Sequence, residues 1–244
     1  GDARRAEVQV PPMSDFTPAN YYLAALLAGF LLGAMPWGLW IGFLVRRVDV
    51  RTLGSGNMGA TNVFRSIGPF WGVLALLLDA FKGYAAAALL PGILGGSEAY
   101  PYIRLLGGLA AVAGHVFSPF AGFRGGKGVA TSAGVFLGLA PLATALAFGV
   151  FMLLVAVSGF VSLGSLLAAL ALPLAIYLTR HTLPGQAWVP VLLLAVILSA
   201  LIWVRHRTNM RRLLAGTEAS FWKKQKPGEP GSSSHQPPPD GAAR

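Results

Sequence analysis

Long apolar runs separated by short polar segments dominate the chain. Runs long enough to cross a membrane cover residues 21–45, 67–91, 104–122 and 188–204, since a membrane helix needs about 20 mostly apolar residues. Residues 128–179 contain no charged residue and are too long for a single crossing. The pattern therefore predicts an all-α integral membrane protein, with two or three further helices in the uncharged stretch.

The positions of Lys and Arg decide between two and three helices in that stretch. These cations gather at 46–65, at 123–127 and at 205–226, and cations in short loops favour the cytoplasmic side of a membrane. Three helices place all of these segments on one side, whereas two helices would leave the last segment outside. We therefore expect seven transmembrane helices, several of them short, with breaks near Pro141 and within 158–165. The N-terminus would lie outside and the C-terminus in the cytoplasm.

The two ends of the chain lack apolar periodicity. Residues 1–20 are polar and begin with Gly, and Met13 is a candidate native start. The sequence after Lys226 is rich in Pro, Gly and Ser, which is typical of disorder. We expect a membrane domain at 21–222, followed by a basic and then disordered tail at 223–244.

Composition agrees with a membrane protein. Hydrophobic residues make up 55% of the chain and charged residues 11%, against about 25% charged residues in soluble domains. The absence of Cys excludes disulfides, thiolate metal sites and a Cys nucleophile. The net charge of +10 is explained largely by topology. We expect membrane lipid as a partner and no nucleic acid, because no soluble binding fold accompanies the cations.

Four polar segments fall on the predicted cytoplasmic face, and the first is LGSGNMGATNVFR at 53–65. Its candidate binding groups are Gly56, the side chains of Ser55, Asn57, Thr61 and Asn62, and the Arg65 guanidinium. Glycine lets backbone amides approach an anion closely, and a guanidinium can hold a phosphate bidentately. The alternative is a tight turn followed by an N-capped helix.

The second segment, HVFSPFAGFRGGKGVAT, covers 115–131 and leads into a predicted helix. Amides at a helix N-terminus beside a cation form an anion site. The candidates are Gly125, Gly126, Lys127 and Gly128, with His115 nearby. The segment is not a Walker A loop, because position 128 is Gly where a hydroxyl residue is required. The alternative is a glycine-rich turn with an inward-facing lysine.

Two further segments carry polar side chains. In SGFVSLGS at 158–165, Ser162 is placed to donate to a ligand oxygen, although a helix break with hydroxyl caps is the simpler interpretation. In RHRTNMRRLLAGTE at 205–218, His206 and Asn209 share one helix face. The near-neutral reference pKa of histidine makes His206 a candidate general base. The alternative is a basic helix that binds anionic lipid.

Ionisable residues also occur inside the membrane. Asp79 and Lys82 lie three residues apart in the second apolar run, where an intrahelical ion pair is the structural interpretation. His115, His206 and Asp79 show no metal-ligand spacing, so we expect no metal. Neither histidine begins the H-x-x-x-x-D pattern of the familiar glycerolipid acyltransferases.

Taken together, GSGNMGATNVFR, GHVFSPFAGFRGGKGVAT, VSLGS and RHRTNMRRLLAGTE resemble, in order and spacing, the bacterial acyl-phosphate:glycerol-3-phosphate acyltransferases. The resemblance covers roughly residues 20–222. It implies a seven-helix inner-membrane enzyme of bacteria with its active site facing the cytoplasm. Such an enzyme transfers a fatty acyl group from acyl phosphate to the 1-hydroxyl of glycerol 3-phosphate, giving lysophosphatidic acid and phosphate without a cofactor. Ser118, which intervenes before Pro119, departs from the usual second motif.

The resemblance also implies residue roles. Ser55 and Arg65 would be required and bind phosphate, the glycine loop 125–128 would hold substrate phosphate, and the other functional positions would be His206, Asn209, Glu218 and Ser162. Acyl phosphate is already activated, so the protein has to orient two anions and stabilise developing charge. We expect direct transfer without an acyl-enzyme, with His206 or a substrate phosphate as the proton acceptor.

Two other functions use the same residues. A membrane transporter of phosphate or organophosphate would also need basic, glycine-rich sites, but transporters often carry inverted repeats and a midplane site, and no repeat is visible here. A lipid-binding scaffold would leave the first two motifs unexplained. The oligomeric state stays open, and a monomer is compatible with the sequence.

Overall fold

The computed structural model describes residues 17–94, 102–185 and 187–221, and these residues form helices and no strand. The longer elements are α1 (Pro18–Ala34), α2 (Trp37–Arg46), α3 (Ala60–Ser66), α4 (Pro69–Tyr84), α5 (Leu90–Ile93), α6 (Ile103–Val116), α7 (Val129–Leu139), α8 (Pro141–Ser158), α9 (Val161–Leu178), α10 (Trp188–Arg205) and α11 (Arg207–Leu214). Short helical turns are η2 (Val50–Thr52), η3 (Ala85–Leu89), η4 (Pro119–Ala121) and η5 (Arg180–Thr182). The all-α prediction is confirmed. The tail expected at 223–244 and most of the extension expected at 1–20 lie outside the described residues.

Six described segments are long and apolar enough to cross a membrane. They are Pro18–Arg46, Pro69–Ile93, Ile103–Ala121, Pro141–Ser158, Val161–Leu178 and Trp188–Arg205. A seventh apolar helix, α7, has only 11 residues. The uncharged stretch contains three helices, α7, α8 and α9, with breaks at Ala140 and at 159–160. Both breaks fall where the sequence predicted them.

The first apolar run is not one continuous helix. It is divided at Met35 and Pro36 into α1 and α2, because proline has no N–H to continue the helical ladder. Two polar side chains, one from α4 and one from the loop after α6, bind the carbonyls left open there. Lys82 Nζ donates to Met35 O at 2.7 Å, and the Ser118 hydroxyl donates to Ala34 O. The break is therefore part of the packed structure.

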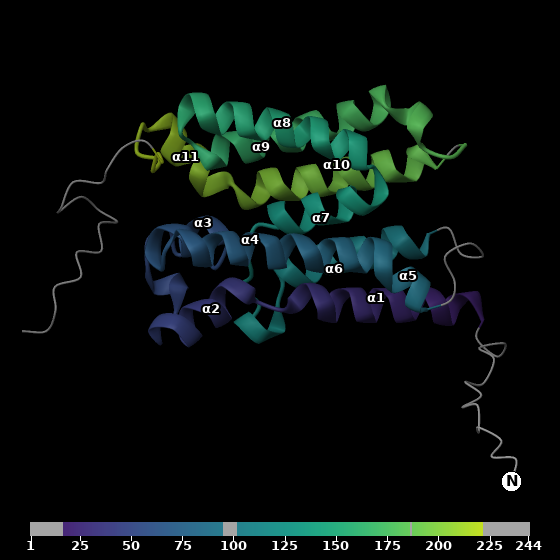
Figure 1. The fold of residues 1–244 in the computed structure, drawn as a ribbon, viewed down its shortest axis with the longest axis horizontal. Coiled ribbons are helices and arrows are strands. Elements are labelled where there is room, and N and C mark those ends of the chain that lie inside the picture. The colour runs from purple at the N-terminus through teal and green to yellow at the C-terminus, as the bar shows by residue number, and fades with distance from the viewer. Residues whose placement is uncertain (1–16, 95–101, 186, 222–244) are drawn as a thin grey trace, which may run out of the picture.

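The helices form two layers that run along one axis (Figure 1). One layer contains α1 to α6 and the other contains α8 to α11, with α7 between them. Small residues allow α1 and α6 to approach closely. An added Cβ at Gly33 would lie 2.0 Å from Ala111 O, and one at Gly114 would lie 2.2 Å from Phe30 O. Such small-residue contacts are typical of membrane helix pairs.

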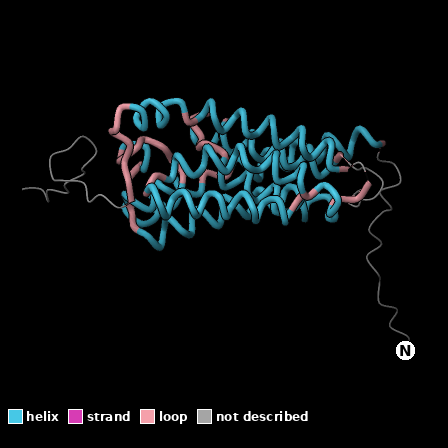
Figure 2. Tube along the Cα trace, turned by 90° about the horizontal axis from the view of Figure 1, so that it is seen from above, coloured by secondary structure: helices cyan, strands magenta, loops and turns pink. Residues whose placement is uncertain are grey.

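Large apolar side chains remain exposed along the helices. Leu27 is 58% exposed on α1, Leu77 is 60% exposed on α4 and Leu153 is 64% exposed on α8. Exposed leucines at these positions suit contact with lipid. The loops gather mainly at the two ends of the bundle (Figure 2), and the polar segments before α3 and around α11 share one of those ends.

Candidate active site

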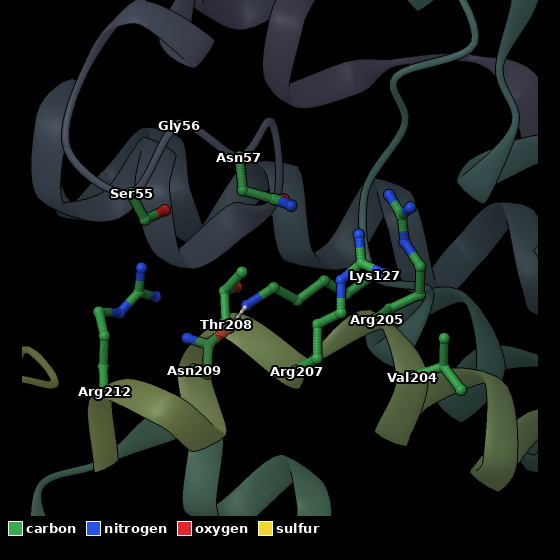
Figure 3. A pocket seen from close by; sticks show the side chains of 10 residues that line it. All are labelled: Ser55, Gly56, Asn57, Lys127, Val204, Arg205, Arg207, Thr208, Asn209 and Arg212. Carbon is green, nitrogen blue, oxygen red and sulfur yellow. Dashed lines mark hydrogen bonds between the residues drawn. The ribbon is translucent and has the colours of Figure 1, made fainter. Parts of the chain in front are cut away.

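A cavity of about 250 Å³ lies where α11 faces the loop before α3. Its lining residues are Ser55, Gly56, Asn57, Lys127, Val204, Arg205, Arg207, Thr208, Asn209 and Arg212. Figure 3 shows the 55–57 loop on one side and α11 on the other, with Lys127 reaching between them. The cavity thus joins three of the four motifs, which lie far apart in the sequence.

Asn62 holds the first loop in shape. Its side chain is buried and its Oδ1 accepts from the Ser55 amide at 2.9 Å. Its Nδ2 donates to Val50 O at 2.7 Å and to Asn57 O at 2.8 Å. These bonds fold the loop so that Ser55 lines the cavity. Asn62 and Thr61 were predicted as binding groups, but neither lines the cavity, and the hydrogen bonds of Asn62 are those of a loop scaffold.

The glycine loop packs directly on His115. The Gly126 amide donates to His115 O at 3.1 Å and the Gly125 amide donates to Val116 O at 3.2 Å. A Cβ at Gly126 would lie 2.2 Å from His115 Nε2, so only glycine fits there without a shift. Gly128 then N-caps α7 with φ of +85°. Because the two amides bind main-chain carbonyls, the group that the loop presents to the cavity is the Lys127 ammonium.

Lys127 belongs to a hydrogen-bonded chain. Its Nζ donates to Asn209 Oδ1, and Asn209 Nδ2 donates to Glu218 Oε1 at 2.6 Å. Arg212 Nε donates to Glu218 Oε2 at 2.7 Å. Burial, with smaller effects from Arg212 and other nearby cations, lowers the pKa of Lys127 to about 8. The ammonium is therefore charged at neutral pH and held at the edge of the cavity.

Glu218 supplies the negative charge among these cations. Burial alone would raise its pKa, but the hydrogen bonds from Arg212 and Asn209 and the charge of Arg212 outweigh burial and hold the pKa below its ordinary value. Glu218 therefore stays ionised at neutral pH. Ser162, near the start of α9, is buried and does not line the cavity.

His206 is buried at the junction between α10 and α11. Its Nδ1 lies 2.8 Å from Ile202 O, as a donor in the corresponding tautomer. Burial, followed by the charge of Lys127, lowers the pKa of His206 to about 4. His206 is therefore neutral at physiological pH. Of the pair predicted to share a helix face, only Asn209 lines the cavity.

Arg65 lies near the site and is exposed. Its Nη2 donates to Ala219 O at 3.1 Å, and its Cζ lies 5.0 Å from the centre of the Phe221 ring. It does not line the cavity, but its charge acts on Lys127 and is itself influenced by Glu218. Arg65 and Lys127 are therefore parts of one electrostatic cluster.

Asp79, Lys82 and His115 form a buried group inside the membrane-spanning part. Asp79 Oδ1 lies 2.8 Å from Lys82 Nζ and 3.5 Å from His115 Nδ1. The predicted intrahelical ion pair is confirmed. His115 does not line the cavity, and its ring lies against Gly126. The group therefore contacts the glycine loop through the His115 ring.

The sequence reasoning missed several lining residues on α10 and α11. Arg205, Arg207, Thr208 and Arg212 line the cavity, but the three arginines were assigned to topology and Thr208 was not singled out. A helical signal was available for part of this set, since positions 209 and 212 are three apart on α11 and so share a face. Arg205 also donates to Gly125 O and Gly126 O at 3.2 Å each.

Comparison with known proteins identifies this arrangement. A family model described as glycerol-3-phosphate acyltransferase matches residues 23–216. The chain belongs to the glycerol-3-phosphate acyltransferase family. It is therefore an enzyme that acylates glycerol 3-phosphate, and the transporter and scaffold alternatives are set aside.

Relatives of known name cover most of the chain. Glycerol-3-phosphate acyltransferase from Desulfotalea psychrophila is 47% identical over 199 residues, which are 82% of this chain and 97% of the relative. The acyltransferase of the same name from Trichlorobacter lovleyi is also 47% identical, over 80% of this chain and 95% of that protein. The span of the family model, residues 23–216, includes the segments that form the cavity.

Two solved structures share the fold. Both are of PlsY (YgiH), described as an integral membrane glycerol 3-phosphate acyltransferase. The glycerol 3-phosphate form has a TM-score of 0.73 and 37% identity, and covers 82% of this chain and 95% of that one. The lysophosphatidic acid form has a TM-score of 0.71 and 36% identity over the same shares. The acyltransferase described here is accordingly a multi-pass membrane protein.

Proposed function

We propose that this acyltransferase moves a fatty acyl group from acyl phosphate to the 1-hydroxyl of glycerol 3-phosphate, giving lysophosphatidic acid and phosphate. The observation that carries the proposal is the cavity in which Lys127, held by Asn209, faces the Ser55 loop among Arg205, Arg207 and Arg212. Both proposed substrates are phosphate anions, and such a concentration of cations favours them. Because acyl phosphate is already activated and the cations bind phosphate, the proposed reaction needs no cofactor.

Some of these residues bind substrate, and others stabilise charge during the reaction. Arg65 grips the phosphate of glycerol 3-phosphate, and Lys127 neutralises charge that develops on the phosphate leaving group. Ser55 donates from its loop to a substrate oxygen at the cavity wall. Asn209 and Glu218 fix the direction of the Lys127 ammonium through the bonds that join them.

The chemical step is a direct displacement at the acyl carbon. The 1-hydroxyl oxygen forms the new ester bond while the bond from the acyl carbon to the phosphate oxygen breaks. The hydroxyl proton goes to a substrate phosphate. The second pKa of a phosphomonoester is about 6, so its dianion is a stronger base than the His206 imidazole. His206 is buried and has a pKa of about 4. It therefore does not accept the proton, and stays neutral beside Lys127.

We also propose seven membrane crossings within residues 21–222, with α7 as a short crossing. The N-terminus lies outside, and the C-terminus and the cavity face the cytoplasm of a bacterial inner membrane. This orientation is supported by the cations gathered at the cavity end. The donor's acyl chain lies among membrane lipid while its phosphate reaches the cavity.

The test is an assay of the purified protein in detergent with palmitoyl phosphate and glycerol 3-phosphate. We expect phosphate and lysophosphatidic acid in equal amounts, and no product when palmitoyl-CoA replaces palmitoyl phosphate. Ser55→Ala should lower the rate, whereas Thr52→Ala, which removes a hydroxyl that binds only Asp49 O in the neighbouring turn, should not. Product from palmitoyl-CoA alone would overturn the proposed donor, and an acyl group trapped on Ser55 would overturn direct transfer.

A further inference from the structure

The segment after α11, residues 216–221, joins the two helix layers across the cavity end, and we call it the strap. The Phe221 amide donates to Gly159 O at 2.9 Å, in the turn between α8 and α9. On the other side, the Phe221 ring meets the Phe64 ring of α3, with centres 5.3 Å apart and planes at 74°. The strap therefore contacts elements that come from both layers.

The same strap holds the side chain of Arg65. Ala219 O accepts from Arg65 Nη2 at 3.1 Å, and the Phe221 ring lies 5.0 Å from Arg65 Cζ. Arg65 is exposed, and a free arginine side chain has many rotamers that it must give up on binding a ligand. Contacts that order the side chain beforehand reduce that loss.

The chemistry of the two contacts leaves the guanidinium free to bind an anion. An arginine carries five N–H donors, and the bond to Ala219 O engages one edge of the group. The attraction between a cation and an aromatic ring uses none of these donors. Phe221 can therefore hold the guanidinium while its remaining donors face a phosphate.

The strap also connects Arg65 to Lys127. Glu218, next to Ala219 in the strap, accepts from Asn209 at 2.6 Å, and Asn209 in turn accepts from Lys127. One short segment thus contacts Arg65 of α3 directly and Lys127, which precedes α7, through Asn209. Loss of the strap contacts would change the distance between the two cations.

We infer that Phe221 is a positioning residue, which holds the Arg65 guanidinium in place to bind the phosphate of glycerol 3-phosphate. The inference rests on the proposed phosphate-binding role of Arg65. It assigns a function to the aromatic ring itself, beyond its packing against Phe64. Its consequence is an effect of Phe221 on substrate binding without a matching effect on the chemical step.

The experiment measures binding of glycerol 3-phosphate to the full-length protein by calorimetry, without acyl donor so that no reaction occurs. Phe221→Leu keeps an apolar side chain but removes the ring, and should weaken binding about two- to five-fold, the range of an exposed cation–π contact. Phe221→Tyr should bind as the unchanged protein does. The control is Phe120→Leu, which removes an exposed ring on the η4 turn and should have no effect.

Kinetics and a double variant separate positioning from loss of structure. In Phe221→Leu, KM for glycerol 3-phosphate should rise two- to five-fold at unchanged kcat, in a protein that still unfolds in a single cooperative transition. In an Arg65→Gln background, Phe221→Leu should weaken binding no further. Unchanged binding in Phe221→Leu, equal weakening in Phe221→Leu and Phe221→Tyr, or additive effects in the double variant would each overturn the inference. Absence of lysophosphatidic acid synthesis by the unchanged protein would instead refute the proposed function.

Discussion

Lys82 Nζ, on α4, donates to Met35 O at 2.7 Å, and Met35 is the residue that directly follows α1. The same ammonium lies 2.8 Å from Asp79 Oδ1, and both side chains are almost fully buried. The ion pair therefore does more than neutralise two charges in the membrane. It satisfies a carbonyl that the break at Pro36 leaves without a helical partner, and so fixes the place where the first apolar run divides.

Removal of the lysine should destabilise the fold strongly. Lys82→Met leaves the Asp79 carboxylate buried without its partner, which costs about 3–5 kcal/mol in comparable sites. Thermal unfolding in detergent should therefore occur at a clearly lower temperature. The double variant Asp79→Asn with Lys82→Met should recover part of the loss. Arg46→Met, which alters an exposed cation, serves as control, and equal effects at positions 46 and 82 would contradict the role of burial.

The alkaline pH dependence should report Lys127. Its pKa is lowered to about 8, so the ammonium is charged below that pH and neutral above it. The value of kcat/KM for glycerol 3-phosphate should therefore fall above about pH 8, by about tenfold per pH unit. Because the pKa of His206 is about 4, a fall of the rate below about pH 6 would report the substrate phosphate, whose second pKa is about 6, and not the histidine.

Arginine at the same position provides the control for this profile. A guanidinium keeps its charge throughout the accessible pH range. Lys127→Arg should therefore remove the alkaline fall, even if its different shape lowers the overall rate. The same fall in Lys127→Arg as in the unchanged protein would show that another group titrates.

The sequence was sufficient for the fold class because its main signals are local. Apolar run length predicted the spans, and the helix breaks at Ala140 and 159–160 followed from proline, glycine and serine. The division of the first run at Pro36 was missed, since that residue sits within an otherwise continuous apolar stretch. The break is stabilised by the hydrogen bond from Lys82 to Met35 O. The two residues are distant in sequence, so only the folded structure shows this bond.

The site was predictable where chemistry and motif coincide, as for Ser55, Lys127 and Asn209, which all line the cavity. The site was less predictable where a side chain positions the loop or another side chain and does not itself face the ligand. Asn62 was expected to bind a ligand, but its amide holds the loop together. Arg212 was assigned to topology, because its partner Glu218 is reached only when the chain turns back after α11. Neither the pairing of Arg212 with Glu218, six residues later, nor the loop bonds of Asn62 follow a helical spacing, so the sequence shows no periodic pattern for them.

Close packing of α1 on α6 should be essential for stability. A side chain at Gly33 would begin 2.0 Å from Ala111 O, so Gly33→Val must separate the two helices. We expect a loss of about 1–3 kcal/mol or more, seen as a lower unfolding temperature in detergent. Gly149→Val is the matched control, because an added Cβ at Gly149 meets nothing within 4 Å. Equal stability of the two variants would contradict the proposed packing.

The contact between Gly126 and His115 should control activity more than stability. A Cβ at Gly126 would lie 2.2 Å from His115 Nε2, so Gly126→Ala must displace the loop that carries Lys127. A displacement of about 1 Å at a catalytic group can lower the rate about a hundred-fold. Gly92→Ala, where an added Cβ meets nothing within 4 Å, should retain full activity. Replacing His115 with Ala in the Gly126→Ala protein removes the clash and should restore part of the rate. If it restores none, the loop is held by something other than the histidine ring.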